Sequence, residues 1–276
     1  MPIQKKIHIR KPSHGWPKLN LREVWESREL LVILAWRDIS VRYKQTLLGG
    51  LWAVIQPFVT MIIFSIVFGK LAQIPSDDIP YPIFSYTALV PWSFFVNALN
   101  KSSLSLISNS NLINKVYFPR LVLPLSAVMV GTIDFFVAFF MLLIMMIFFG
   151  ILPTVAILFL PFFILLTLIT SLGIGIWIAT LNVKFYDFQN ALPFMIQAWM
   201  FATPIAYPSS LLEEPWRSIY GLNPMAGVVE GFRWALLGTE TSPGGILIVS
   251  SISACVILIA GMYFFKRVEP TFADFL

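Results

Sequence analysis

Charge is scarce in this sequence. Asp, Glu, Lys and Arg make up 12% of its 276 residues, about half of the share in an average soluble domain. By contrast, 58% of the residues are hydrophobic and the mean hydropathy is +0.80. These values nearly exclude a soluble globular enzyme, and the many aromatic residues exclude a disordered chain. What remains is a polytopic membrane protein, built as one bundle of helices.

Cysteine and histidine are also scarce. Cys255 is the only cysteine, so no internal disulfide or cysteine-based zinc site can form. Both histidines precede residue 15, which argues against a histidine-rich metal centre and against a Ser/His/Asp triad. The sequence has no G-x-x-x-x-G-K-[ST] phosphate loop for ATP. We therefore predict that this chain holds no cofactor and no metal.

Apolar runs dominate the chain from residue 47 onward. The first contains 23 residues without a charge, enough to cross roughly 30 Å of hydrocarbon. Residues 121–181 contain a single charge and predict two long helices joined at a turn near Gly150 and Pro153. The second and fifth runs are shorter. The predicted spans are about 47–69, 83–100, 121–149, 153–181, 191–207 and 246–265.

The distribution of positive charge predicts the orientation of these spans. If the N-terminus is inside, sixteen of the nineteen Lys and Arg residues fall on the inner side. No apolar run in residues 1–44 is long enough for a signal peptide. We therefore predict both termini in the cytoplasm, with residues 1–25 forming a basic tail and residues 26–276 a single membrane domain.

Residues 26–44 are predicted to form an amphipathic helix on the inner membrane surface. Val32 and Trp36 fall on one face of this helix, and Arg37 and Lys44 fall on another. A membrane anchor whose cations face anionic headgroups is the simpler interpretation. A gate or a partner contact at the cytoplasmic mouth is the alternative.

Two inner loops are candidates for docking to a partner. In residues 100–118 a sparse apolar stripe of Leu104, Ile107 and Leu112 lies among Ser and Asn, as in a short surface helix that binds in a groove. The shorter loop at 181–190 interleaves aromatic and charged residues and offers a second contact. A solvated loop remains the alternative for both.

Asp134 is the single charge in the third predicted span. A carboxylate in hydrocarbon is costly, so we expect it to face the bundle interior or an interface. A proton or ion relay needs further ionisable groups at the same depth, and the sequence supplies none there. We therefore interpret Asp134 as a structural hydrogen-bond acceptor, with a relay as the alternative.

Residues 208–244 are too apolar for an ordinary outer loop. Asn223 and Pro224 are expected to divide the segment into two short helices, and Glu230 and Arg233 are spaced to pair on one helical face. We predict that these helices dip back into the outer leaflet, which is tolerated where protein covers the backbone. Two helices lying flat on the outer surface are the alternative.

Several stretches together resemble one known family, the permease (membrane) subunit of ABC transporters that export polysaccharides such as O-antigen, capsule and teichoic acid. The O-antigen type is the most similar. The stretches follow the family order over nearly the whole chain. They are RDISVRYKQTLLGGLWAVIQP at 37–57, NLINKVYFPRLVLPL at 111–125, LNVKFYDFQN at 181–190, ATPIAYP at 202–208 and YGLNPMAGVVEGFRWALLG at 220–238.

The resemblance implies an all-α fold with six transmembrane helices, an N-terminal interfacial gate helix at 26–44 and a periplasmic re-entrant helix pair between spans 5 and 6. It also implies a homodimer in the cell inner membrane. This dimer would work with two copies of a separate ABC ATPase, which would bind the ATP and magnesium. The implied substrate is a long glycan on an undecaprenyl diphosphate lipid. Membrane lipids are further partners, and no nucleic acid is expected.

The resemblance also assigns roles to residues. Residues 102–116 would be the main coupling helix, with 182–190 as the second ATPase contact. The coupling residues are Leu104, Ile107, Leu112, Lys184 and Tyr186. The gate-helix residues are Trp36, Arg37, Arg42 and Lys44, of which the three cations are our candidates for a diphosphate headgroup, with anionic phospholipid as the alternative ligand. The re-entrant residues are Trp216, Glu230, Arg233 and Trp234.

The expected function is therefore ATP-driven export of a lipid-linked polysaccharide, with this chain as a non-enzymatic transport subunit. An ABC permease for another cargo, such as a drug or a small lipid, is the first alternative. The second is a membrane-embedded glycan-modifying enzyme, which needs a catalytic acid or base, and only Asp134 lies at depth. An ion-coupled carrier needs more intramembrane polar ligands than this chain supplies.

Overall fold

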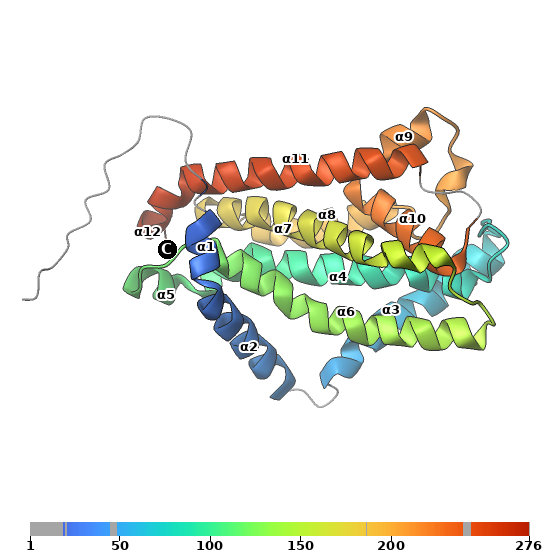
Figure 1. Ribbon diagram of the computed structural model, residues 1–276, viewed down its shortest axis with the longest axis horizontal. Helices are drawn as coiled ribbons and strands as arrows, with labels where there is room; N and C mark the ends of the chain where they lie inside the picture. The colour runs from blue at the N-terminus through green and yellow to red at the C-terminus, as the bar shows by residue number, and fades with distance from the viewer. Residues whose placement is uncertain (1–18, 20, 45–48, 186, 240–243, 276) are drawn as a thin grey trace, which may run out of the picture.

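The chain folds into an elongated bundle of helices (Figure 1). The computed structural model describes residues 19, 21–44, 49–185, 187–239 and 244–275, and these ranges contain no strand. This confirms the predicted all-α class. The α-helices are α1 (Leu21–Glu26), α2 (Arg28–Lys44), α3 (Trp52–Phe64), α4 (Tyr81–Ser108), α5 (Ser110–Lys115), α6 (Val122–Phe148), α7 (Leu160–Lys184), α8 (Asp187–Phe201), α9 (Trp216–Tyr220), α10 (Pro224–Leu237), α11 (Gly244–Val268) and α12 (Phe272–Phe275).

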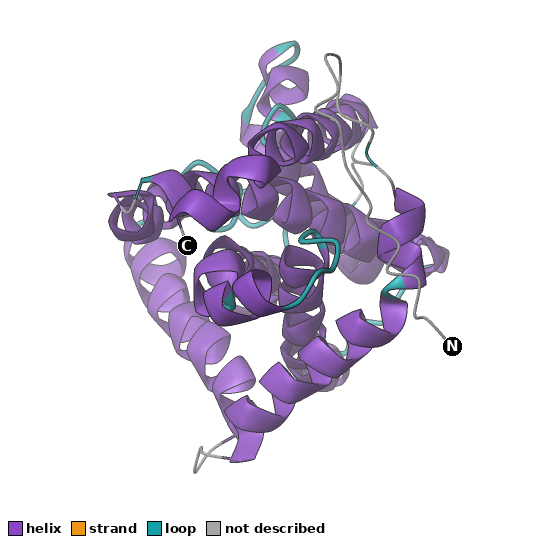
Figure 2. Cartoon of the chain, turned by 90° about the vertical axis from the view of Figure 1, so that its left-hand side faces the viewer, coloured by secondary structure: helices purple, strands orange, loops and turns teal. Residues whose placement is uncertain are grey.

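Helix α4 forms the centre of the bundle. It packs against α3, α6, α7, α8 and α10, and most of its side chains from Ile83 to Leu99 are buried. An apolar helix without a polar face is stable when other helices surround it. Figure 2 looks along the bundle and shows the helices packed around its long axis.

Four helical segments within the described residues are long and apolar enough to cross a membrane. They are Gly49–Leu71, Val122–Phe148, Val155–Lys184 and Gly244–Thr271. These agree with the first, third, fourth and sixth predicted spans to within about three residues at most ends. The protein is therefore an integral membrane protein.

The second and fifth predicted spans correspond to α4 and α8, which do not meet this criterion. Helix α4 has 28 residues and a length of roughly 42 Å, but the part after Asn97 is rich in Ser and Asn. Helix α8 has 15 residues and a length of roughly 22 Å, and a proline lies inside it. For these two segments, membrane crossing stays a prediction.

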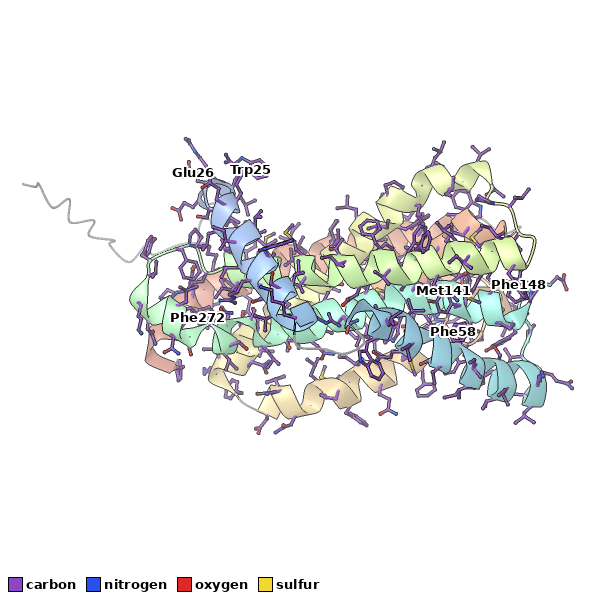
Figure 3. All side chains as sticks on the ribbon, turned by 90° about the horizontal axis from the view of Figure 1, so that it is seen from below. Trp25, Glu26, Phe58, Met141, Phe148 and Phe272 are labelled. Atoms are coloured by element: carbon purple, nitrogen blue, oxygen red, sulfur yellow. The ribbon has the colours of Figure 1, made fainter. Side chains whose placement is uncertain are left out.

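Segments that the charge pattern places on one side of the membrane lie together at one end of the bundle. This end is held by a group of buried side chains that we call the basal cluster. It consists of Leu34, Leu106, Ile113, Phe118, Leu121, Val122, Leu123, Ile176, Ala179, Val183, Phe265 and Phe272. Figure 3 labels Phe272 at this end and Phe148 at the opposite one.

Contacts at the opposite end join segments that the sequence predicts on the outer side. Ser210 donates a hydrogen bond of 2.8 Å to Asp77, and Gly238 lies against the side chain of Thr154. Gly238 ends α10 with a positive φ of 68°, a conformation that glycine adopts without strain. The two ends of the bundle thus match the two predicted sides.

Helix α2 crosses the bundle obliquely and packs against α6 (Figure 1). It buries Leu34 and Ala35 against the bundle, while Val32 and Trp36 are exposed. Apolar side chains therefore lie on two faces of α2 rather than on the single stripe predicted from Val32 and Trp36. The sequence pattern indicated only the exposed face with Val32 and Trp36. The buried face did not stand out, because Leu34 and Ala35 are adjacent in the sequence and form no stripe at helical spacing.

The contact between α4 and α7 is close enough to require glycine. A Cβ atom added at Gly175 of α7 would lie 2.4 Å from the Ser102 Oγ atom of α4. We predict that Gly175→Val lowers the free energy of unfolding in detergent by about 1–3 kcal/mol, because overpacking forces helices apart. Ala260→Val, on the exposed face of α11, is the control and should change little. Equal unfolding curves for the two variants would contradict a close α4–α7 contact.

Candidate functional site

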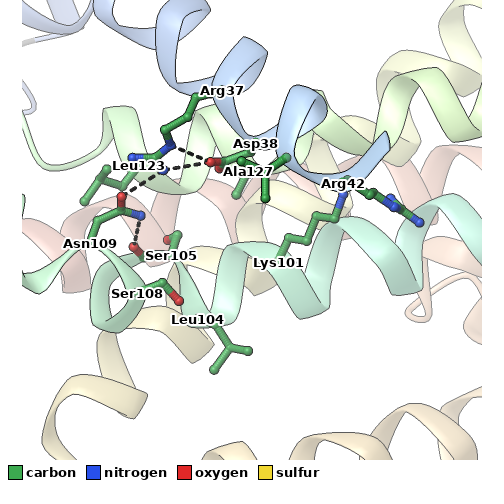
Figure 4. Close-up of a pocket in the computed structure, with 11 residues that line it drawn as sticks. Arg37, Asp38, Arg42, Lys101, Leu104, Ser105, Ser108, Asn109, Leu123 and Ala127 are labelled. Carbon is green, nitrogen blue, oxygen red and sulfur yellow. Dashed lines mark hydrogen bonds and ion pairs between the residues drawn. The ribbon is translucent and has the colours of Figure 1, made fainter. Parts of the chain in front are cut away.

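A pocket of about 500 Å³ lies between α2, α4 and α6 near the basal cluster. Three of its lining residues are cations, namely Arg37, Arg42 and Lys101. Asp38 supplies a carboxylate, and the remaining wall combines polar residues such as Asn109 with apolar residues such as Leu104 (Figure 4). The pocket therefore has an excess of positive charge, which suits an anionic ligand.

Arg37 is fixed by polar contacts to α2 and to the end of α4. Its guanidinium lies 2.7 Å from the Asp38 carboxylate and donates to the Asn109 side-chain oxygen at 3.0 Å. Asn109 in turn donates to the Ser105 carbonyl at 2.9 Å (Figure 4). These bonds orient the Arg37 guanidinium at the pocket, where the side chain is 47% exposed.

Arg42 forms an ion pair with Asp134 that joins α2 to α6. The Asp134 side chain is 4% exposed and that of Arg42 is 33% exposed. The carboxylate thus faces the bundle interior, as the sequence predicts. Its partner Arg42 lies 92 residues earlier in the chain, so no local sequence pattern could have identified the pair.

Lys101 is the cation of this pocket that the sequence analysis missed. The residue sits on α4, and its Nζ atom is shut off from solvent without a hydrogen-bond acceptor among the described residues. From the sequence it was counted only as one positive charge of an inner loop. The one sequence feature that could have placed Lys101 on a membrane helix is its position directly after the apolar run 83–100. Lys44, the other predicted headgroup contact, ends α2 and is exposed.

The predicted coupling helix at 102–116 is divided between the end of α4 and the short helix α5. Leu104 lines the pocket, Ile107 is half-buried, and Leu112 packs against the basal cluster. The exposed apolar side chains follow α5, and Tyr117 among them is 81% exposed. The sequence pattern did not indicate the exposed pair Val116 and Tyr117, because these two residues follow α5 and belong to no helical stripe.

The C-terminal segment braces the loop that follows α5. The Arg120 guanidinium donates to the Glu269 carbonyl and lies 5.7 Å from the centroid of the Phe272 ring. The Phe272 ring packs against Phe265 of α11 at 5.2 Å between centroids. The loop after α5 is therefore tied to the last helices of the described chain.

The second predicted contact, at 181–190, lies where α7 ends and α8 begins. Lys184 is exposed there, with its Nζ atom 5.3 Å from the centroid of the Phe185 ring. Tyr186, the other residue predicted here, lies outside the described residues. The segment belongs to the same end of the bundle as α5, because Val183 is part of the basal cluster.

Residues 209–238 form the two helices that the sequence predicts, broken at Asn223 and Pro224. The Asn223 side chain caps α10 by accepting a hydrogen bond of 3.1 Å from the Met225 backbone N–H. Helix α10 is buried against α4, α7 and α11, so it does not lie flat on the surface. Trp216 is exposed on α9, and Trp234 packs on Phe159 at 5.6 Å between ring centroids.

Glu230 and Arg233 of α10 form a buried ion pair with a distance of 3.1 Å, as their spacing predicts. Arg233 is 1% exposed, and its guanidinium donates to the carbonyls of Pro204 at 2.6 Å and Ile205 at 2.8 Å. It also lies 3.5 Å from the centroid of the Phe84 ring in α4. Through these contacts Arg233 holds the irregular segment 202–208 against α10 and α4.

Comparison with known proteins identifies the family. The profile of the ABC-2 type transporter family matches residues 29–237, which extend from the first turn of α2 to the end of α10. The chain belongs to the ABC-2 type transporter family. This confirms the family resemblance seen in the sequence.

Three relatives match the chain over most of its length. The chain is 30% identical to an O-antigen export system permease protein RfbA of Klebsiella pneumoniae, over 90% of this chain and 95% of that protein. It is 28% identical to RfbA of Myxococcus xanthus over 92% and 98%. It is 26% identical to the polysialic acid transport protein KpsM of Escherichia coli over 84% and 91%.

The buried Arg233 supports a prediction on stability. Arg233→Met leaves the buried Glu230 carboxylate without its cation and two carbonyls without their donor, so we expect a loss of about 3–5 kcal/mol in the free energy of unfolding. The control is Arg22→Met, which removes an exposed ion pair with Glu26, four residues along the same helix. This variant should lose less than about 0.5 kcal/mol. Unfolding of the purified variants in detergent measures both values. A small loss in the free energy of unfolding for Arg233→Met would contradict the conclusion that Arg233 holds segment 202–208 against α10.

Proposed function

We propose that this chain is the membrane subunit of an ATP-driven exporter that moves a lipid-linked polysaccharide across the inner membrane. The observation that carries this proposal is the ABC-2 family match together with full-length relatives named for O-antigen export and for polysialic acid transport. Both names describe transport of a polysaccharide. Two copies of this chain would form the membrane part, with two copies of an ABC ATPase that bind ATP and magnesium.

We further propose six membrane crossings with both termini inside. The four segments that meet the length and hydropathy criterion supply the first, third, fourth and sixth crossings, and α4 and α8 would supply the other two. The basal cluster supports this topology, because it collects residues from α2, α5, α7 and α11 at one end. A short or polar helix is tolerated in a membrane when protein surrounds it, and α4 is surrounded. Helices α9 and α10 would then be the re-entrant pair on the periplasmic side.

The pocket between α2, α4 and α6 is proposed to receive the diphosphate group of the lipid carrier. Arg37 and Arg42 have the planar donor arrangement that binds phosphate oxygens in pairs. Lys101 is the third cation of the pocket, and Lys44 adds a further charge at the end of α2. Helix α2 would act as the gate, with Val32 and Trp36 in contact with lipid on its exposed face. The undecaprenyl chain attached to this group would remain in the bilayer.

The end of the bundle around α5 is proposed to dock the ATPase. The exposed Val116 and Tyr117 provide an apolar contact, and Lys184 marks the second contact. Closure of the ATPase would shift the permease between inward-facing and outward-facing states through this contact. The hydrogen bond from Arg120 to the Glu269 carbonyl links the loop after α5 to the end of α11, so a movement of this loop would also move α11.

The alternative of a membrane-embedded enzyme loses support from the structure. A general acid or base needs a carboxyl group that can exchange its proton. The Asp134 carboxylate is engaged by the Arg42 guanidinium in an ion pair that joins α2 to α6. Transport of another cargo by the same family remains the competing proposal, and an export assay with the native glycan separates the two.

The proposal predicts an ATPase that copurifies with this chain. Tagged chain purified from its native membrane should bring down an ABC ATPase in equal amount, and the eluate should hydrolyse ATP. Val116→Asp with Tyr117→Asp should reduce the copurified ATPase at least about tenfold, because a charge at a contact of buried apolar groups costs more than about 1.4 kcal/mol. The amount of glycan at the cell surface should also fall in this variant.

Leu71→Asp is the control for this experiment, because Leu71 is exposed and lies toward the opposite end of the bundle. It should copurify the ATPase as well as the unaltered chain does. A chain that purifies alone, without ATP hydrolysis, would contradict the proposed function. Copurification that persists in the Val116 and Tyr117 variant would reject only the docking surface.

A further inference from the structure

A second pocket lies between α3, α4 and α8, and we call it the amide pocket. Its volume is about 100 Å³, enough for a few water molecules or for the hydroxyl-bearing edge of a larger ligand. Its two carboxamides are Gln56 of α3 and Asn97 of α4. Trp92, Ser93 and Thr60 add an indole ring and two hydroxyl groups, and no charged residue among those described lines it.

Several polar groups of the amide pocket are unused within the protein. The side chains of Gln56, Ser93 and Asn97 form no hydrogen bond with any described residue, and neither does the indole N–H of Trp92. Trp92 is only 4% exposed. Helix α3 belongs to a segment that can cross the membrane, where lipid offers no partner to a polar group. The pocket therefore has to hold water or a polar ligand.

The amide pocket continues a row of polar residues on α4. Residues four apart lie on one face of a helix, and this spacing relates Ser93, Asn97, Lys101 and Ser105. The first two line the amide pocket, and the last two line the pocket between α2, α4 and α6, which we call the cationic pocket. Asn97 and Lys101 are one turn apart, or roughly 6 Å along the helix axis. The two pockets are therefore neighbours on the central helix.

The two pockets differ in chemistry as the two parts of a glycolipid headgroup do. Three cations line the cationic pocket, and cations bind phosphate groups. Carboxamides both donate and accept hydrogen bonds, which suits the adjacent hydroxyl groups of a neutral sugar. In a diphosphate-linked glycan the first sugar is bonded directly to the diphosphate. A diphosphate beside Lys101 thus brings this sugar close to Asn97.

We propose that the amide pocket binds the sugar next to the diphosphate, with Gln56 and Asn97 as hydrogen-bond partners of its hydroxyl groups. Helix α4 runs from the outer end of the bundle to the basal cluster, so Asn97 lies on the outer side of Lys101. The bound sugar therefore points into the bundle. The glycan then starts its passage between α3, α4 and α8.

This inference rests on the proposed function, because it takes a diphosphate-linked glycan as the ligand. Its test therefore uses two probes that share the lipid and the diphosphate, namely undecaprenyl diphosphate and the glycan lipid extracted from the same cells. Only the second probe carries sugar. The response to undecaprenyl diphosphate tests the cationic pocket, and the difference between the probes tests the amide pocket.

The first experiment measures protection of introduced cysteines in the purified full chain, reconstituted in nanodiscs of neutral lipid. Cys255→Ser removes the only cysteine, so that Ser93→Cys reports on the amide pocket and Leu104→Cys on the cationic pocket. A charged methanethiosulfonate reagent should modify both, because both pockets are wet. Saturating glycan lipid should slow modification at both positions at least about tenfold. Undecaprenyl diphosphate should slow it only at Leu104→Cys.

Val256→Cys is the control for this experiment, because Val256 is 58% exposed on the apolar helix α11. It should react slowly and respond to neither probe. A Ser93→Cys chain that reacts as slowly as this control would overturn the proposal, since the pocket would then be dry. If both probes protect Leu104→Cys and do not differ at Ser93→Cys, the sugar site alone is rejected. If neither protects Leu104→Cys, the diphosphate site is rejected and this inference with it.

The second experiment changes the two carboxamides. Gln56→Leu with Asn97→Leu should raise the glycan-lipid concentration for half protection of Leu104→Cys at least about tenfold, because hydrogen bonds to the sugar are lost. The value for undecaprenyl diphosphate should stay the same. Asn100→Leu is the matched control, since it changes the same residue type three positions later on α4, outside both sets of lining residues. This control should leave both values unchanged.

An equal change for the two probes would overturn the proposal, because the substitutions would then act on the cationic pocket or on the fold. Surface glycan in cells gives an independent measurement. It should fall in the variant with Gln56→Leu and Asn97→Leu, although the ATPase still copurifies, and it should stay normal for Asn100→Leu. Full export by the double variant would overturn the sugar site and leave the exporter in place.

Discussion

A polar group inside this apolar bundle has to find its partner within the protein, because lipid and apolar side chains offer no substitute for water. Arg233 meets this requirement with a carboxylate and with the backbone carbonyls of Pro204 and Ile205. Those carbonyls belong to an irregular segment and themselves need donors. The arginine and the segment therefore stabilise one another, and α10 can lie in the interior next to a stretch of chain that is not helical.

Asp134 meets the same requirement in a different way. Its partner Arg42 comes from α2, a helix that lies across the outside of the bundle. The pair positions α2 over a cationic pocket and, at the same time, depends on a residue that solvent and ligands can reach. A contact of this kind is stable and yet open to competition. An anionic lipid headgroup that enters the pocket, as proposed, would therefore meet the cation that also neutralises the buried Asp134 carboxylate.

The sequence predicted the parts of the structure that depend on local patterns. Long apolar runs gave the four strongest spans, the Asn223–Pro224 break divided α9 from α10, and the spacing of Glu230 and Arg233 gave their ion pair. Partners far apart in the chain were not predictable, since one sequence holds no signal that joins Arg42 to Asp134. Lys101 was taken for a loop residue because polar neighbours hide its position on the central helix.

The brace between Arg120 and the C-terminal segment has a consequence for the biogenesis of the protein. Ile113 and Phe118 share the basal cluster with Phe265 and Phe272, which the ribosome makes about 150 residues later. Until that late segment arrives, the loop after α5 lacks the aromatic rings and the carbonyl that hold it. The surface proposed to receive the ATPase is therefore completed only after α11 has been made, so that the proposed assembly with that subunit would have to follow synthesis of the C-terminal segment.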